Sequence, residues 1–164
     1  MNVVAPDPRV ARAWEVLEDV PDPEVPVLSV VDLGVVRDIA PAREGLAITL
    51  TPTYTGCPAT AAIALAIEAA IEGAGLGRPV LKTVLSPPWT TEWMRPRARA
   101  KLAAAGIAPP VARDPDRFAR DPVVPCPRCA SRATEKLSEF GATACKSLWR
   151  CTACREPFEH FKCH

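Results

Sequence analysis

Two short cysteine pairs near the C-terminus constrain the fold of this chain more than any other feature. They are "CPRC" at 126–129 and "CTAC" at 151–154, with 21 residues between them. Two thiolates three residues apart can bind one metal ion, and two such knuckles together form the closed tetrahedral site of structural Zn²⁺. The spacer "ATEKLSEFGATACKSLWR" favours a β-hairpin, so the pattern predicts a zinc ribbon over residues 126–164. The predicted metal ligands are Cys126, Cys129, Cys151 and Cys154.

Two other interpretations of these four cysteines stay open. They could be reduced thiols without a metal, and a rubredoxin-like iron site would use the same ligands. A segment of roughly 40 residues cannot build an adequate core, so metal binding would supply much of its folding free energy. This requirement favours a metal site over bare thiols.

Four more potential ligands lie outside the two knuckles. They are Cys145, His160, Cys163 and His164. They could form a second metal site or exchange with the first set of ligands. Alternatively, a histidine near a chain end is solvated, a spare cysteine packs as a small apolar residue, and Cys145 could form a disulfide with Cys163 after purification. The sequence leaves these alternatives open.

The length of 164 residues allows a compact domain of about 100 residues with a small appendage. Residues 108–125, "APPVARDPDRFARDPVVP", have no sustained periodicity and are rich in proline and charge, which is typical of an extended linker. We therefore expect a first domain over 1–107, a linker over 108–125 and the ribbon over 126–164.

Local patterns in the first domain predict a small mixed sheet with packed helices, an α+β fold. In chain order we expect a helix over 8–19, antiparallel strands over 35–39 and 46–50, a helix after Pro58, a third strand within 78–86 and a basic helix that ends near Gly106. The third strand follows the second through a helix. A right-handed crossover of this kind places the two strands parallel in one sheet.

The seventh cysteine, Cys57, lies between the second predicted strand and the following helix, in "TPTYTGCPAT". Unpaired N–H groups and the positive dipole end of a helix favour a thiolate at this position. Asp22 and Glu24 lie on the loop "VPDPEVP", which the small sheet could bring near Cys57, and a thiolate with carboxylates can hold iron transiently. The alternative is that Cys57 packs as a small apolar residue and Asp22 caps a turn.

No catalytic residue is predicted. Both histidines lie in the predicted ribbon, so Cys57 has no nearby base in its own domain. The common nucleotide-binding and metalloprotease motifs are absent from the sequence.

Charge and hydropathy exclude several classes of partner. The chain has 20 basic and 19 acidic residues, so no global field draws it to nucleic acid or anionic lipid. No stretch approaches the roughly 20 apolar residues of a membrane span, and the N-terminal residues lack a signal-peptide pattern. We expect a cytoplasmic protein, whose seven cysteines bind metal or react rather than form structural disulfides.

Three motifs resemble the small domain of SufT-type iron–sulfur assembly proteins: a DPE loop, a DLG turn and a TxxxCP helix start. They occur in order in "DPEVPVLSVVDLGVV" (22–36) and "TPTYTGCPA" (51–59). With "FGATACKSLWRCTACREPFEHFKCH" at its end, nearly the whole chain is similar to the PaaD family, the accessory proteins of the phenylacetyl-CoA epoxidase (ring-1,2-epoxidase) system.

The resemblance implies a non-enzymatic accessory role in aerobic phenylacetate degradation, in which the protein helps to mature the iron–sulfur or di-iron centre of the epoxidase system. By family match, Cys57 would contact the cluster or iron in transit, and Asp22 and Glu24 would shape that site. The ribbon would dock the oxygenase or reductase component, and the protein could form a homodimer.

Two competing hypotheses remain. In the first, the protein is a non-catalytic adaptor that holds oxygenase and reductase together, and Cys57 is incidental. In the second, the ribbon binds nucleic acid, which balanced charge and a single tyrosine, Tyr54, argue against.

Overall fold

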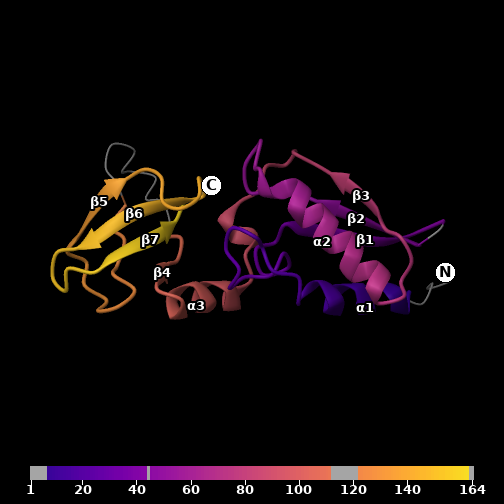
Figure 1. The fold of residues 1–164 in the computed structure, drawn as a ribbon, viewed down its shortest axis with the longest axis horizontal. Helices are drawn as coiled ribbons and strands as arrows, with labels where there is room; N and C mark the ends of the chain where they lie inside the picture. The colour runs from indigo at the N-terminus through magenta and orange to yellow at the C-terminus, as the bar shows by residue number, and fades with distance from the viewer. Residues whose placement is uncertain (1–6, 44, 112–121, 163–164) are drawn as a thin grey trace, which may run out of the picture. The chain divides into compact units, whose positions relative to one another are not determined.

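The computed structural model describes residues 7–43, 45–111 and 122–162. The chain divides into two compact units. Unit 1 comprises Met1–Trp89 and Trp93–Arg95, and unit 2 comprises Thr90–Glu92 and Pro96–His164. Each unit has its own sheet (Figure 1). The architecture confirms the predicted α+β class with small mixed sheets.

Unit 1 contains two helices and a three-stranded sheet. Its elements are α1 (Pro8–Leu17), β1 (Val36–Ala42), β2 (Gly45–Leu50), α2 (Ala59–Gly73) and β3 (Val80–Thr83). The strand order is β1-β2-β3, with β1 antiparallel and β3 parallel to the central strand β2. Both pairings confirm the prediction, because α2 provides the crossover between β2 and β3. The first helix ends two residues earlier than predicted, where the N–H of Asp19 turns back to the carbonyl of Val16.

The core of unit 1 follows from two periodicities. Along β2, Leu46, Ile48 and Leu50 alternate with half-buried residues and are almost fully buried. Along α2, every fourth residue, Ile63, Ile67 and Ile71, is buried. Figure 1 shows α2 lying over the sheet, so these two rows form the centre of the core. The N-terminus of α2 is thereby fixed beside the end of β2.

The DLG turn owes its conformation to a close neighbour. Gly34 has φ +70°, and a Cβ there would lie 2.4 Å from the carbonyl oxygen of Trp93. The indole N–H of Trp89 donates to the carbonyl of Leu33 at 2.9 Å, and the N–H of Arg95 donates to the carbonyl of Asp32 at 2.9 Å. The predicted turn is therefore clamped by the segment that follows β3.

Unit 2 contains α3 (Pro96–Ala104), β4 (Ile107–Ala108), β5 (Thr134–Ser138), β6 (Lys146–Cys151) and β7 (Pro157–Phe161). The short 3₁₀ helix η1 (Thr91–Trp93) precedes α3. The strand order is β4-β7-β6-β5, and β5 and β6 form the antiparallel hairpin predicted between the two knuckles. β7 returns antiparallel to β6, and β4 pairs with it in parallel.

Both described ends of the predicted linker pack into unit 2. Gly106, with φ +76°, ends α3 and turns the chain into β4. Ala108 and Val124 are almost fully buried in the cluster that also contains Trp149 and Phe158, and Val111 packs against it. The burial of these apolar residues holds both ends in the folded unit, although the proline and charge content of the segment predicts an extended linker. The middle of the predicted linker, residues 112–121, lies outside the described residues.

Candidate metal centre and reactive thiol

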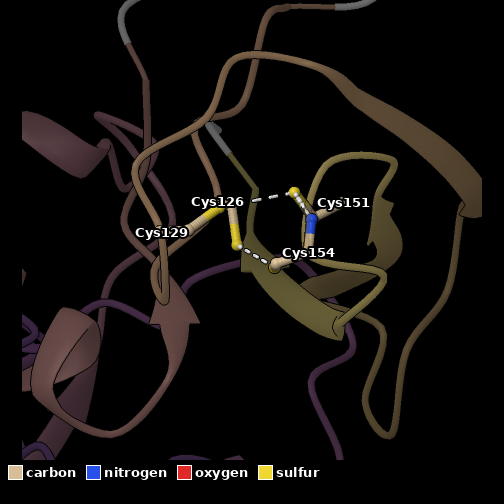
Figure 2. Close-up of side chains that lie close together, drawn as sticks. All are labelled: Cys126, Cys129, Cys151 and Cys154. Carbon is tan, nitrogen blue, oxygen red and sulfur yellow. Dashed lines mark hydrogen bonds between the residues drawn. The ribbon is translucent and has the colours of Figure 1, made fainter.

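The two knuckles bring four thiols together at one end of the ribbon sheet. Figure 2 shows the side chains of Cys126, Cys129, Cys151 and Cys154 converging. All four Sγ atoms lie within 4.8 Å of one another. Cys126 Sγ lies 3.7 Å from Cys154 Sγ, and Cys129 Sγ lies 3.6 Å from Cys151 Sγ. These distances are far too long for disulfide bonds.

The geometry fits one tetrahedral metal ion. A metal–sulfur bond of about 2.3 Å gives a tetrahedron with edges of about 3.8 Å between sulfur atoms. These two sulfur–sulfur distances differ from that edge by only about 0.2 Å or less. Four protein ligands leave no open position for a substrate, so the site suits a structural ion.

The two knuckles have the same backbone construction. The N–H of Cys126 donates to the carbonyl of Ser131, and the N–H of Cys151 donates to the carbonyl of Glu156, each at 2.9 Å. The residue after the second cysteine has a positive φ in both cases, 59° at Ala130 and 64° at Arg155. Each turn thus reverses the chain and aims two sulfur atoms at one point.

Backbone dipoles also point at the sulfur atoms. The N–H of Cys154 donates to Cys151 Sγ at 3.5 Å, and this bond is the main cause that lowers the pKa of Cys151 to about 6. A low pKa prepares the thiolate form that a metal requires. Arg128 and Glu156 form an ion pair that links the two knuckles.

The four ligands differ in burial. Cys126 and Cys151 belong to the core cluster of unit 2 with Trp149 and Phe158, whereas Cys129 and Cys154 are exposed. The ion would therefore join the ribbon core to the knuckle tips. Sequence reasoning missed the left-handed residues Ala130 and Arg155. Their position directly after the second cysteine of each knuckle could have predicted a left-handed residue, although neither is the glycine that usually adopts this conformation.

Two of the four additional candidate ligands can be placed. Cys145 is buried, with Sγ 3.0 Å from the hydroxyl of Thr143. His160 is also buried, with Nδ1 3.4 Å from the hydroxyl of Ser147. Neither residue belongs to the four-cysteine group. Cys163 and His164 lie outside the described residues.

His160 carries an unsatisfied polar atom. Within the described part of the chain, its Nε2 has no hydrogen-bond partner. Desolvation is the main cause that lowers the pKa of His160 to about 4, and the charges of Lys136 and Lys162 act in the same direction. The ring lies edge-on to Trp149, with centroids 6.0 Å apart.

Cys57 lies where the sequence places it, in the turn between β2 and α2. Gly56 before it has φ +82°, and the N–H of Cys57 donates to the carbonyl of Tyr54 at 3.3 Å. The carbonyl of Cys57 accepts from the N–H of Thr60 at 3.2 Å. The side chain is half-buried, and α2 has neither a side-chain cap nor an acidic residue in its first turn. Cys57 therefore directly precedes Pro58, the N-cap residue of α2, and the first turn of that helix contains no carboxylate.

Asp22 has a structural task in its own loop. Its Oδ1 accepts hydrogen bonds from the N–H groups of Glu24 at 2.9 Å and Val25 at 2.8 Å, and the residue is buried. Glu24 is half-buried. Across residues 7–43, 45–111 and 122–162, the four cysteines of the ribbon are the one group of three or more metal-ligating side chains with converging ligand atoms. Cys57, Asp22 and Glu24 form no such group.

Comparison with known proteins matches the two units to two families. Residues 11–82 match the family described as iron–sulfur cluster assembly protein. Residues 111–162 match the family described as PaaD zinc beta ribbon domain. No helix among the described residues is long and apolar enough to span a membrane.

A full-length relative and a solved structure extend these matches. A protein of Escherichia coli (strain K12), named as a subunit of 1,2-phenylacetyl-CoA epoxidase, is 48% identical over 163 residues, which are 99% of this chain and 98% of that protein. The crystal structure of a domain of unknown function, DUF59, from Bacillus anthracis is 28% identical, with a TM-score of 0.54. That match covers 58% of this chain and 92% of the other.

Proposed function

This chain belongs to the PaaD family of 1,2-phenylacetyl-CoA epoxidase subunits, and from that membership we propose that it is a cytoplasmic, non-enzymatic accessory protein of the epoxidase system in aerobic phenylacetate degradation. In this proposal it matures an iron–sulfur or di-iron centre of the system. The metal or cluster is then its cargo and not a resident cofactor.

The observation that carries the proposal is the setting of Cys57. This half-buried thiol lies at the N-terminus of α2, within the segment that matches iron–sulfur cluster assembly proteins. Cysteine sulfur is the ligand type that holds iron–sulfur clusters. Asp22 holds the DPE loop in shape through Oδ1, and Glu24 is the carboxylate that would assist at the cargo.

One thiolate cannot complete the four-ligand shell of a cluster. The remaining ligands would come from the client protein, from a second copy of the chain or from a small external thiol. Because Cys57, Asp22 and Glu24 form no converging group by themselves, the cargo would be held loosely. Loose binding suits a protein that passes its cargo on.

The ribbon would bind structural Zn²⁺ through its four cysteines and dock the oxygenase or reductase component. Its hairpin presents two exposed apolar residues, Leu137 at 49% and Phe140 at 64% exposure. Lys162 holds the Phe140 ring, with Nζ 4.6 Å from the ring centroid, and also donates to the carbonyl of Glu139 at 3.0 Å. Exposed apolar residues in a strand of the hairpin and in the turn after it are suited to contact with a protein partner.

The exposed apolar residues of the ribbon, Leu137 and Phe140, support a second candidate function. A non-catalytic adaptor needs the ribbon surface and has no use for the thiol at α2. The absence of a converging Cys57 site among the described residues favours this alternative. The two functions make opposite predictions for the loss of Cys57.

The deciding experiment compares the wild type with Cys57→Ser. Both proteins are prepared anaerobically, exposed to iron and sulfide, and examined by elemental analysis and visible absorption. If the protein is a carrier, each holds about one zinc per chain, and the wild type alone gains iron, sulfide and absorption in the visible range. Thr55→Ala is the matched control, since Thr55 is an exposed neighbour in the same loop and the variant keeps the thiol.

Reconstituted epoxidase activity gives an independent readout. A carrier loses activity in Cys57→Ser and keeps it in Thr55→Ala. Full activity of Cys57→Ser, together with zinc as the sole bound metal in all three proteins, would overturn the carrier proposal in favour of the adaptor.

A further inference from the structure

The loop between β5 and β6 holds an exposed aromatic residue on an ordered backbone. Phe140 is 64% exposed, yet its N–H donates to the hydroxyl of Ser138 at 3.2 Å. The N–H of Gly141 donates to the carbonyl of Lys146 at 2.8 Å, and the N–H of Lys146 donates to the carbonyl of Thr143 at 3.1 Å. The loop therefore closes on itself and leaves the Phe140 ring outside the core.

An ion pair between β6 and β7 supports this loop. Lys146 is only 5% exposed, and its Nζ donates to Oε2 of Glu159 at 2.8 Å. The other oxygen of Glu159, Oε1, accepts from the N–H of Ala142 at 2.6 Å. Burying an ion pair is costly and adds little net stability, but such a pair can specify one arrangement of its surroundings. Glu159 thus ties the loop to the sheet.

The glycine that follows Phe140 is matched to this ion pair. A Cβ at Gly141 would lie 2.5 Å from Oε1 of Glu159, the oxygen that accepts from Ala142. It would also lie 3.4 Å from the Cβ of Lys146. A side chain at this position would push the carboxylate away from the loop.

Lys162 adds a positive charge beside the aromatic ring. Its Nζ lies 4.6 Å from the centroid of the Phe140 ring and donates to the carbonyl of Glu139 at 3.0 Å. The carboxylate of Glu139 pairs with Lys136 instead. Across the residues that the structure describes, no carboxylate pairs with Lys162. The loop thus presents an apolar ring and an ammonium group whose charge is not neutralised.

We propose that Phe140 anchors the ribbon to its client protein, and that the client surface it fits is an apolar pocket with a carboxylate at its rim. The ring enters the pocket, and the carboxylate pairs with Lys162. This anchoring rests on the docking role of the ribbon proposed above and adds the chemistry of the surface that receives it. Because Glu159 already orders the loop, little conformational freedom is lost on binding.

The charge of the loop argues against a second copy of the chain as the occupant. A two-fold contact between two such loops would bring both Lys162 ammonium groups together, and like charges repel. A different protein with an acidic rim has the opposite charge. The observed pair of ring and cation therefore favours a client protein.

The test measures binding of the full-length, zinc-loaded protein by isothermal titration calorimetry. The probes are the purified oxygenase and reductase components of the epoxidase, each prepared with and without its metal centre. We expect the wild type to bind one component, and Phe140→Ala to weaken this binding about tenfold or more. Leu85→Ala is the matched control, since Leu85 is 53% exposed in unit 1, and it should bind like the wild type.

Two further comparisons test the charge and the support. Lys162→Glu should weaken binding about tenfold at low salt, whereas Lys162→Arg keeps the charge and should bind like the wild type. Lys82→Glu, an equal charge change on an exposed residue of β3, is the control. Gly141→Ala should weaken binding severalfold although Phe140 is still present. Gly73→Ala is its control, because a Cβ there would meet nothing within 4 Å.

Circular dichroism and zinc content establish that each variant is folded. Unchanged binding by Phe140→Ala, or equal binding by Lys162→Glu and Lys162→Arg, would overturn the anchor and leave the docking role of the ribbon intact. Unchanged binding by Gly141→Ala would overturn the support assigned to Glu159. Sedimentation velocity of the wild type gives a further check, because self-association that Phe140→Ala abolishes would make a second copy the occupant and overturn the choice of partner.

Failure of the anchor and failure of the cargo function give different results. A wild type that binds neither component at about 100 μM would overturn the anchor together with the docking role. Iron and sulfide uptake tests the cargo function separately, and Phe140→Ala should retain that uptake. Cys57→Ser should in turn bind the client like the wild type.

Discussion

Gly34 shows how a single residue fixes the DLG turn. Its φ of +70° strains any side chain, and a Cβ would meet the carbonyl oxygen of Trp93 at 2.4 Å. We expect Gly34→Ala to lower the free energy of unfolding by about 3 kcal/mol, because backbone strain and overpacking add. Gly75→Ala is the control, with φ +74° but open space around the Cβ, and should cost about 1 kcal/mol. Urea unfolding measures both, and equal losses would contradict the role assigned to Trp93.

A second prediction at the residue scale concerns His160 and pH. Its pKa falls from 6.5 in the unfolded chain to about 4 in the folded protein, so between these values the unfolded state binds more protons. Stability should therefore fall as the pH is lowered from about 6.5 to 4, by at most about 3 kcal/mol from this group. His160→Phe keeps the edge-on ring contact with Trp149 and removes the titrating group. The difference in unfolding free energy between variant and wild type should therefore change between pH 6.5 and pH 4. The zinc content of both proteins is measured at each pH as a control. A difference that stays constant over this range would exclude the effect.

The helices and strands divide into elements that make their own core and elements that we expect to depend on a metal. β2 and α2 bury a row of three large aliphatic residues each, Leu46, Ile48 and Leu50 facing Ile63, Ile67 and Ile71. The ribbon strands have a smaller cluster, two members of which are the ligands Cys126 and Cys151. Unit 1 should therefore fold without zinc, whereas the ribbon should not.

Removal of the metal tests this division. A chelator, or Cys129→Ser, should expose the amides of β5, β6 and β7 to hydrogen exchange by at least a hundredfold and leave those of β2 protected. Cys145→Ser removes a buried thiol outside the four-cysteine group and should retain one zinc per chain. Zinc loss in Cys145→Ser, or an unchanged ribbon after chelation, would contradict the assignment.

At the scale of the whole molecule, sequence patterns predict the parts that depend on neighbours along the chain. Alternation predicts β2, the four-residue spacing predicts α2, and the crossover between them predicts the parallel β3. The CxxC spacing predicts the hairpin of the ribbon, although ligand distances come from the structure alone.

Features that depend on distant packing could not be predicted. The two-residue strand β4 has no local signal, and it exists because Ala108 is buried beside Trp149 and Phe158. The contact of Gly34 with Trp93 joins residues far apart in sequence. The Nε2 of His160, which has no partner among the described residues, likewise reflects three-dimensional neighbours. The hydrogen bonds of Asp22 are local by contrast, and they match the alternative in which Asp22 caps a turn.

The division of the chain into two units has a practical consequence. Residues 90–92 belong to unit 2, although both neighbouring segments, up to Trp89 and from Trp93 to Arg95, belong to unit 1. The chain therefore passes from one unit to the other three times within the eight residues 89–96. No single cut between residues 89 and 96 separates unit 1 from unit 2 completely. A chimera of two relatives joined at one point in this segment would therefore contain residues of one unit from both parents.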